Sequence, residues 1–412
     1  MCFSGCTGES AVLPQGPRAA YNHAIVFGQP RGSLDRASGK PTPMRIYCDH
    51  NATTPMEPRV RSAMEPWLSA AANASSLHAE GRAARRALED AREDVAALFA
   101  AEPRDVVFTS GATEANNMAM GGEGPTAASG IEHPSVLEPL RRKQRLRTLA
   151  TGRDGVVCLA DLEVALKEGC RAAAVMATNN ETGVRQPWRS AAALCAAQGA
   201  RLHVDAVQEA GKGELCCAAF PGFTMAISGH KLGGPQGIGA LWIAPETRIP
   251  PLLLGGAQER MRRAGTENIA AAVGLGVACR IARVEREERT LRLEQREALF
   301  LVAARAAAQD LQIHGTQQPG GRAPGTLSLR VPGLLAETLV IACDLEGLAL
   351  SVGSACSSGA ARPSHVLDTM GLAAGVVVES LRVSLSASTP EAEATRAGEI
   401  FGRMVNRMRG QR

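Results

Sequence analysis

The 412-residue chain is poor in lysine and in aromatic residues. Lysine and arginine together number 45, but only five are lysines, at positions 40, 143, 167, 212 and 231, and aromatic residues make up 3% of the chain. Where arginine supplies nearly all the positive charge, a lysine suggests a position that needs an amine. An amine can form a Schiff base with an aldehyde, which a guanidinium cannot.

Other absences exclude whole classes of function. The sequence has no apolar run long enough to span a membrane, and its net charge of +4 is close to neutral for this length, which argues against nucleic-acid and membrane-surface partners. Its eleven cysteines contain no C-x-x-C pair, so neither a disulfide framework nor a zinc ribbon is indicated. A reducing compartment, the cytoplasm, follows as the expected location.

The chain divides into segments of different character. Residues 1–43 are rich in Gly, Pro and Ser and lack periodicity, which predicts a disordered extension, or a false start with Met44 as the true one. We expect residues 44–56 to pack with a small domain, residues 57–310 to form a large domain, and residues 311–412 to form the small one.

Strands alternate with helices along most of the chain. The expected helices are residues 57–70, 79–100 and 190–198, and a long helical stretch is expected over 269–309. The expected strands of the large domain are residues 105–108, 172–177, 201–204, 225–227 and 239–243. In the smaller unit we expect strands at 327–331, 348–352 and 380–385, with helices at 334–346 and at the C-terminus. This order predicts an α/β fold with a mostly parallel sheet and a smaller α+β C-terminal domain.

Polar residues follow several of these strands. Ser110–Glu114 opens a helix whose N-terminus could hold an anion, although an ordinary helix cap explains it as well. Asp205 ends a buried strand and needs a partner, either an arginine or a pyridinium N–H. His133 follows a glycine-rich loop over 121–130, and Asn180 follows another strand. Lys231 lies in the turn between strands 225–227 and 239–243, where a lysine capping the turn is the alternative. Together they describe a pocket for pyridoxal phosphate (PLP).

Cys356 differs from the other cysteines. It lies in a run of small residues, SVGSACSSGAA at 351–361, which would leave its thiol exposed. A structural cysteine is normally packed among larger apolar side chains, as the remaining cysteines are expected to be. Cys356 is therefore a candidate nucleophile.

Eight motifs in the same order carry a resemblance to a known family. They are NATTP at 51–55, TSGATEANN at 109–117, EHPSV at 132–136, NNETG at 179–183, HVDAVQ at 203–208, SGHKLGGPQGIG at 228–239, RRAGTEN at 262–268 and GSACSSG at 353–359. The sequence resembles the cysteine desulfurases, class V aminotransferase-like enzymes of PLP fold type I, from about Ile46 to the C-terminus.

The resemblance implies a role for individual residues. Lys231 would hold PLP covalently, and Asp205 would keep its pyridine nitrogen protonated. His133 would stack on the ring and, with Lys231, carry protons. The phosphate would be bound by Ala112, Thr113, Ser228, His230 and, from a partner subunit, Thr266. Asn180 and Gln208 would bond near the ring oxygen, and Arg382, Asn180 and Asn73 would lie at the substrate carboxylate.

The implied activity is conversion of L-cysteine to L-alanine. Cys356 would carry the sulfur as a persulfide to an acceptor or iron–sulfur scaffold protein, and could ligate an iron–sulfur cluster transiently. The family also implies a homodimer without nucleic-acid or membrane partners.

Two departures from the family pattern bear on substrate choice. Arg382 is followed by SLSAST where a Gly-Arg pair is usual, and His50 replaces a usual Tyr or Asn. Either could shift preference toward selenocysteine. Three alternatives stay open: a selenocysteine lyase or another class V aminotransferase, a nucleotide-binding oxidoreductase, and an inactive scaffold. The oxidoreductase would need a G-x-G-x-x-G after the first strand, and the sequence has none there.

Overall fold

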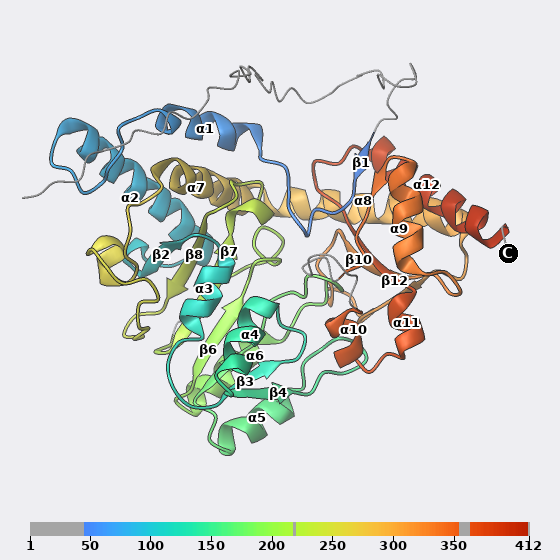
Figure 1. The fold of residues 1–412 in the computed structure, drawn as a ribbon, viewed down its shortest axis with the longest axis horizontal. Coiled ribbons are helices and arrows are strands. Elements are labelled where there is room, and N and C mark those ends of the chain that lie inside the picture. The colour runs from blue at the N-terminus through green and yellow to red at the C-terminus, as the bar shows by residue number, and fades with distance from the viewer. Residues whose placement is uncertain (1–44, 217–219, 354–362, 411–412) are drawn as a thin grey trace, which may run out of the picture. The chain divides into compact units, whose positions relative to one another are not determined.

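The large domain is built on one sheet. The computed structural model describes residues 45–216, 220–353 and 363–410, so Cys356 and the predicted extension 1–43 lie outside the described residues. Within them, seven strands pair in the order β2-β8-β7-β6-β5-β3-β4 (Figure 1). Their bounds are β2 Val106–Thr109, β3 Thr126–Ser129, β4 Leu146–Leu149, β5 Ala172–Ala174, β6 Arg201–Asp205, β7 Phe223–Ser228 and β8 Gly239–Ile243.

The strands of this sheet run mostly in one direction. β8 is antiparallel to its neighbours β2 and β7, and the remaining described pairs are parallel. The predicted mostly parallel sheet is confirmed. The sequence did not predict β3 and β4, and part of the expected loop over 121–130 is the strand β3. Their sequences, TAAS and LRTL, contain neither an apolar run of strand length nor large β-branched or aromatic side chains that would indicate a strand.

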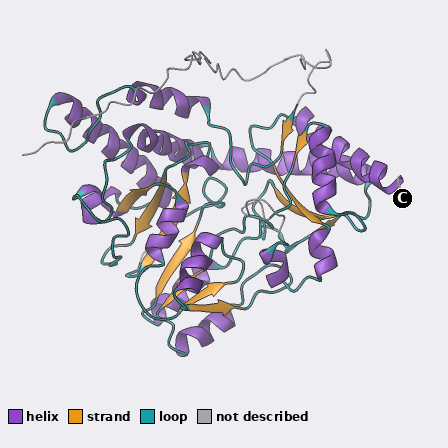
Figure 2. Ribbon diagram, in the orientation of Figure 1, coloured by secondary structure: helices purple, strands orange, loops and turns teal. Residues whose placement is uncertain are grey.

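Helices cover both faces of the sheet (Figure 2). One apolar core lies between the sheet and α2, α5, α6 and α7, with α1 packed on α7, and a second lies between the sheet and α3 and α4. The bounds are α1 Pro58–Leu68, α2 Ala79–Phe99, α3 Ala112–Ala119, α4 Pro134–Arg142, α5 Leu159–Lys167, α6 Trp188–Ala197 and α7 Ile269–Val284. Alternate strand residues supply the two cores, as strand geometry requires: Val204 and Met225 face one and Ala174 and Ala226 the other.

The long helical stretch predicted over residues 269–309 is helical in the structure, with one interruption. The structure has two helices, α7 and α8 (Arg286–Ala307), separated at Glu285, whose backbone φ and ψ are −98° and 10°. The reason lies in tertiary packing: α7 contributes to the core of the large domain, whereas Phe300 and Ala304 of α8 pack in a separate core with α12. No glycine or proline marks the break.

The C-terminal part has its own core. Strands pair antiparallel in the order β12-β10-β9, and β1 pairs in parallel with β11, joining Ile46 to Leu348. The predicted strand 348–352 is shorter, Leu348–Ala349. The remaining bounds are β1 Ile46–Tyr47, β9 Gln312–Ile313, β10 Thr326–Arg330, α9 Ala336–Leu345, β11 Leu348–Ala349, α10 His365–Thr369, α11 Ala374–Val378, β12 Ser380–Ser384 and α12 Glu391–Gly410. Among the described helices, none is long and apolar enough to cross a membrane.

Candidate active site

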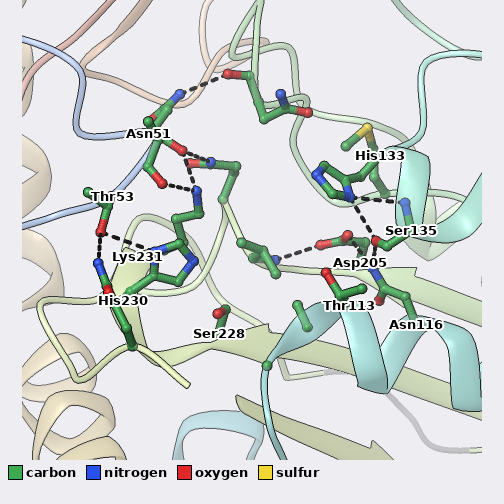
Figure 3. A pocket seen from close by; sticks show the side chains of 18 of the residues that line it. Asn51, Thr53, Thr113, Asn116, His133, Ser135, Asp205, Ser228, His230 and Lys231 are labelled. Carbon is green, nitrogen blue, oxygen red and sulfur yellow. Dashed lines mark hydrogen bonds between the residues drawn. The ribbon is translucent and has the colours of Figure 1, made fainter. Parts of the chain in front are cut away.

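A cavity of about 610 Å³ lies where several strands of the large sheet end. It is lined from the turn after β2 and the start of α3, from the end of β6, and from the turn after β7. Asn51–Thr53 and Arg382, which belong to opposite ends of the chain, also line it. This is the edge at which open parallel sheets bind ligands, and the size suits a small-molecule cofactor with its substrate. Figure 3 shows the side chains that face one another across it.

The start of α3 forms an anion cradle at one end. The first N–H groups of a helix have no acceptor within it, so those of Ala112 and Thr113 are available to a ligand. At Gly111, with φ of 155°, an added Cβ would meet no atom within 4 Å, which leaves open space beside the helix start. Thr113 and Ser228 line the same end. A phosphate fits this donor set.

Gly239 of β8 holds the cradle close to the lysine turn. A Cβ at Gly239 would lie 2.6 Å from the carbonyl oxygen of Ile227 and 2.8 Å from Cα of Gly111. Only glycine allows the strand to approach the helix start this closely.

Lys231 ends the short 3₁₀ turn, Gly229–Lys231, that follows β7. Its Nζ donates to the backbone carbonyls of Asn51 at 2.5 Å and Ala52 at 2.6 Å (Figure 3). These two carbonyls belong to the N-terminal segment, which is distant from Lys231 in the sequence. That segment therefore orients the amine along the cavity wall. The predicted position of Lys231, in a turn between two buried strands, is confirmed.

His230 is positioned by the same segment. Its Nδ1 lies 3.1 Å from Oγ1 of Thr53. Burial, with the nearby charge of Lys231, lowers the pKa of His230 to about 4, so the ring is neutral at physiological pH. It therefore acts as a hydrogen-bonding group rather than as a cation.

Asp205, at the end of β6, belongs to a buried network. Its Oδ2 accepts from Nδ2 of Asn116 at 2.7 Å and its Oδ1 from the backbone N–H of Val207 at 3.0 Å. Because the amide nitrogen of Asn116 faces Asp205, its Oδ1 must accept from Nε2 of His203, 2.9 Å away. Nδ1 of His203 then accepts from the Thr224 hydroxyl at 2.9 Å. Burial lowers the pKa of His203 to about 4, consistent with this neutral form.

The network continues to His133, the N-cap of α4. Nδ2 of Asn116 also donates to Oγ of Ser135 at 2.9 Å, and that hydroxyl lies 2.7 Å from Nδ1 of His133. The backbone N–H of Ser135 donates to the same Nδ1 at 3.1 Å. Nδ1 is thus an acceptor, which places the ring proton on Nε2. Burial lowers the pKa of His133 although Asp205 lies nearby.

Arg382, on β12, lies at the opposite side of the cavity. Its Nη2 donates to Oδ1 of Asp49 at 2.7 Å and its Nη1 to the backbone carbonyl of Asn180 at 3.1 Å. Its Nε is buried and has no acceptor among the described residues. A buried donor without a partner is costly, so a bound carboxylate would be stabilised here.

The structure brings most of the predicted site residues together. Lining the cavity are Ala112, Thr113, His133, Asn180, Asp205, Gln208, Ser228, His230, Lys231 and Arg382. Asn73 and Thr266 are exposed and do not line it. Their roles, and those of the other residues, stay predictions, and Cys356 lies outside the described residues. No group of three or more metal-ligating side chains is found in the described part of the chain.

Sequence reasoning missed the residues that support this site. Asp49, Asn51, Asn116, Ser135 and His203 were not singled out. A signal existed for two of them. His203 and Asp205 share one face of β6 at i and i+2, and a polar pair inside an apolar strand indicates a network. Asn116 lies one turn after Ala112 on α3. Asp49 had no local signal, because its partner Arg382 is 333 residues away.

The residues present fit PLP. The helix start and hydroxyls suit a phosphate, the carboxylate of Asp205 suits a protonated pyridine nitrogen, and the amine of Lys231 suits an aldehyde. When bound, PLP supplies that aldehyde and a ring that withdraws electrons from bonds to the substrate Cα.

Comparison with known proteins agrees with this geometry. The Aminotransferase class-V family matches residues 46–396. The cysteine desulfurase IscS of Dictyoglomus turgidum is 33% identical over 377 residues, covering 88% of this chain and 95% of that protein. A NifS-like protein of Rickettsia africae has a structure matching with a TM-score of 0.80 and 29% identity over 87% of this chain and 99% of its own. SspA in complex with cysteine matches with a TM-score of 0.69 and 27% identity over 84% of this chain and all of its own (100%). The chain belongs to the class-V aminotransferase family and, within it, to the cysteine desulfurases.

Proposed function

We propose that this chain is a PLP-dependent cysteine desulfurase that converts L-cysteine to L-alanine and passes the sulfur to an acceptor. The observation that carries the proposal is one cavity bounded by the Lys231 amine, the Asp205 carboxylate and the start of α3. Relatives named cysteine desulfurase at 33–36% identity support the choice of reaction.

Each wall of the cavity has a part in the reaction. Asp205 holds a proton on the pyridine nitrogen, and Asn116 fixes the orientation of that carboxylate. Arg382 binds the substrate carboxylate through Nε, its donor without a partner. Lys231 Nζ would hold PLP and would act as the base toward the substrate Cα proton, and Nε2 of His133 would supply a proton to the product carbon.

Cys356 supplies the sulfur-accepting thiolate. It attacks the sulfur of the bound cysteine, the new S–S bond forms, and the C–S bond breaks with its electrons remaining on carbon. Protonation of that carbon by His133, with return of the proton to Cα by Lys231, gives alanine and leaves a persulfide on Cys356. An acceptor or iron–sulfur scaffold protein then takes the sulfur. Transient ligation of an iron–sulfur cluster by Cys356 belongs to the same proposal.

A second copy of the chain completes the site in this proposal. Thr266 is exposed, and close to it in the sequence lie exposed apolar side chains, Leu252, Leu253 and Leu254, at 49%, 42% and 83% exposure. Burying them in a homodimer would bring Thr266 to the partner's phosphate cradle. The seven cysteines without disulfides in the described residues favour a reducing location, the cytoplasm.

The test measures alanine and sulfide released from cysteine in the presence of a reductant. We expect Cys356→Ser to retain PLP and its visible absorbance but to release neither product. Cys158→Ser, at an exposed cysteine of the described part of the chain, serves as the control and should be fully active. Full activity of Cys356→Ser would contradict the persulfide step, and release of product only from selenocysteine would favour the lyase alternative.

A further inference from the structure

A second cavity, behind Lys231, is lined by positive charge. It measures about 40 Å³ and is bordered by Lys212, Arg289, His50, Lys231 and Gln208, with Ala387 closing one side. No carboxylate is among its described lining residues. We call it the cationic cavity. Asn51, Gln208 and Lys231 line both this cavity and the candidate active site, so these residues form a wall that the two cavities share.

Two of these cations lack a partner within the described residues. No hydrogen bond or ion pair is made by the side chain of Lys212 or of Arg289 to any described residue, and both residues are partly buried. Burial, outweighing the attraction of Glu209, lowers the pKa of Lys212 to about 8. Nδ1 of His50 is a further buried atom on this cavity without a hydrogen-bond partner in the described part of the chain.

The carboxylates nearest to these cations are already engaged. Glu209, which faces Lys212, accepts from Nε of Arg185 at 3.0 Å. Glu285 and Glu57, which face Arg289, both pair with Arg59, at 2.6 and 2.9 Å. The undescribed segments 217–219 and 354–362 contain no Asp or Glu. Partly buried cations whose nearest described carboxylates are already paired with other arginines are costly, so an outside anion would be stabilised here.

We propose that the cationic cavity is a binding site for one small inorganic monovalent anion of about the size of chloride. A cavity of ≈ 40 Å³ exceeds the roughly 10–15 Å³ that one water needs. Lys212 and Arg289 supply charge-assisted donors, and the amide of Gln208 supplies a neutral one. The anion lies beside the Lys231 side chain without touching the phosphate cradle at the start of α3.

Bromide, which replaces chloride and scatters anomalously, tests the site directly. Crystals of the holoenzyme soaked in bromide should show an anomalous peak between Lys212 and Arg289. In solution, chloride should raise the melting temperature of the holoenzyme by about 1–2 °C relative to gluconate at equal ionic strength, because gluconate is too large for the cavity.

Three variants make the test specific. Lys212→Met should weaken bromide binding by about tenfold or more, whereas Lys143→Met, at an exposed lysine, should leave it unchanged. Ala387→Glu, at a residue 7% exposed, places a carboxylate in the cavity and should remove both the bromide peak and the chloride effect. Absence of a peak in the unmutated protein, or a peak that survives both Lys212→Met and Ala387→Glu, would overturn the proposal.

Discussion

Two walls of the candidate active site differ in how their polar atoms are satisfied. On the cofactor wall, Asn116, Ser135, Asp205 and His203 are joined in one chain of buried hydrogen bonds. On the substrate wall, Nε of Arg382 is buried without a partner among the described residues. A completed hydrogen-bond network holds the cofactor in one orientation. An unpaired donor is suited instead to a substrate that binds and dissociates in each turnover.

The largest effect should come from Lys231, which stands between the two walls. Lys231→Ala should lower kcat by about three orders of magnitude or more, since it removes both the covalent link to PLP and the proton carrier. PLP should still bind through the cradle and Asp205, with an altered absorbance. Steady-state kinetics and the visible spectrum measure the two effects, and Lys143→Ala is the control. A variant that kept its normal rate would remove Lys231 from the reaction.

Arg382 tests the substrate wall. Arg382→Lys keeps the positive charge but loses Nε and the planar pair of donors, so kcat/KM for cysteine should fall about 100-fold. The affinity for PLP should change little, because Asp205 and the cradle are intact. Kinetics and a PLP titration separate these outcomes. An equal loss of PLP affinity would mean that the two walls are not independent.

Acid should destabilise the cofactor wall through His203. A histidine pKa of about 4 in the folded state, against 6.5 unfolded, means that the unfolded chain binds more protons below pH 6.5. The stabilisation is complete above pH 6.5 and is lost as pH falls toward 4, by about 3 kcal/mol, or about 300-fold in the folding equilibrium.

Urea unfolding at pH 7 and at pH 4.5 measures this loss. His203→Gln should be less stable at pH 7 but should show a shallower pH dependence, because it carries no titrating ring. His50, His230 and His314, whose pKa values burial also lowers to about 4, add to this slope, whereas Glu132, whose pKa burial raises to about 8, contributes with the opposite sign. An unchanged slope in His203→Gln would show that His203 titrates normally.

The smallest effect should come from Asn116, which contacts neither substrate nor cofactor in this account. Asn116→Leu should raise the PLP dissociation constant and lower kcat/KM by about tenfold each, because the Asp205 carboxylate loses a buried donor. Asn406→Leu, at an exposed asparagine of α12, is the matched control. The PLP dissociation constants are measured by titration followed by absorbance. Equal dissociation constants for the two variants would contradict a role of the network in PLP binding.

The sequence predicted the cofactor wall better than the substrate wall. Asp205, Lys231 and the start of α3 each lie at the end of a strand, so local patterns located them. Asn116 and His203 were missed although their spacing placed them on the right faces of α3 and β6. The Arg382–Asp49 pair joins opposite ends of the chain, and only the folded structure brings them together.

Prediction of the fold is likewise limited to features that a local sequence pattern determines. The buried strands around Lys231 follow from apolar runs bounded by glycine, whereas the break at Glu285 follows from packing two cores against α7 and α8. A local pattern cannot indicate a break that distant contacts impose.

Borohydride reduction of the purified holoenzyme tests the central claim most directly. A reducible link between PLP and the Lys231 amine should give a visible absorbance band that disappears on reduction, with the pyridoxyl group on the peptide containing Lys231. A colourless protein, or a label on any of the other four lysines, would contradict the account.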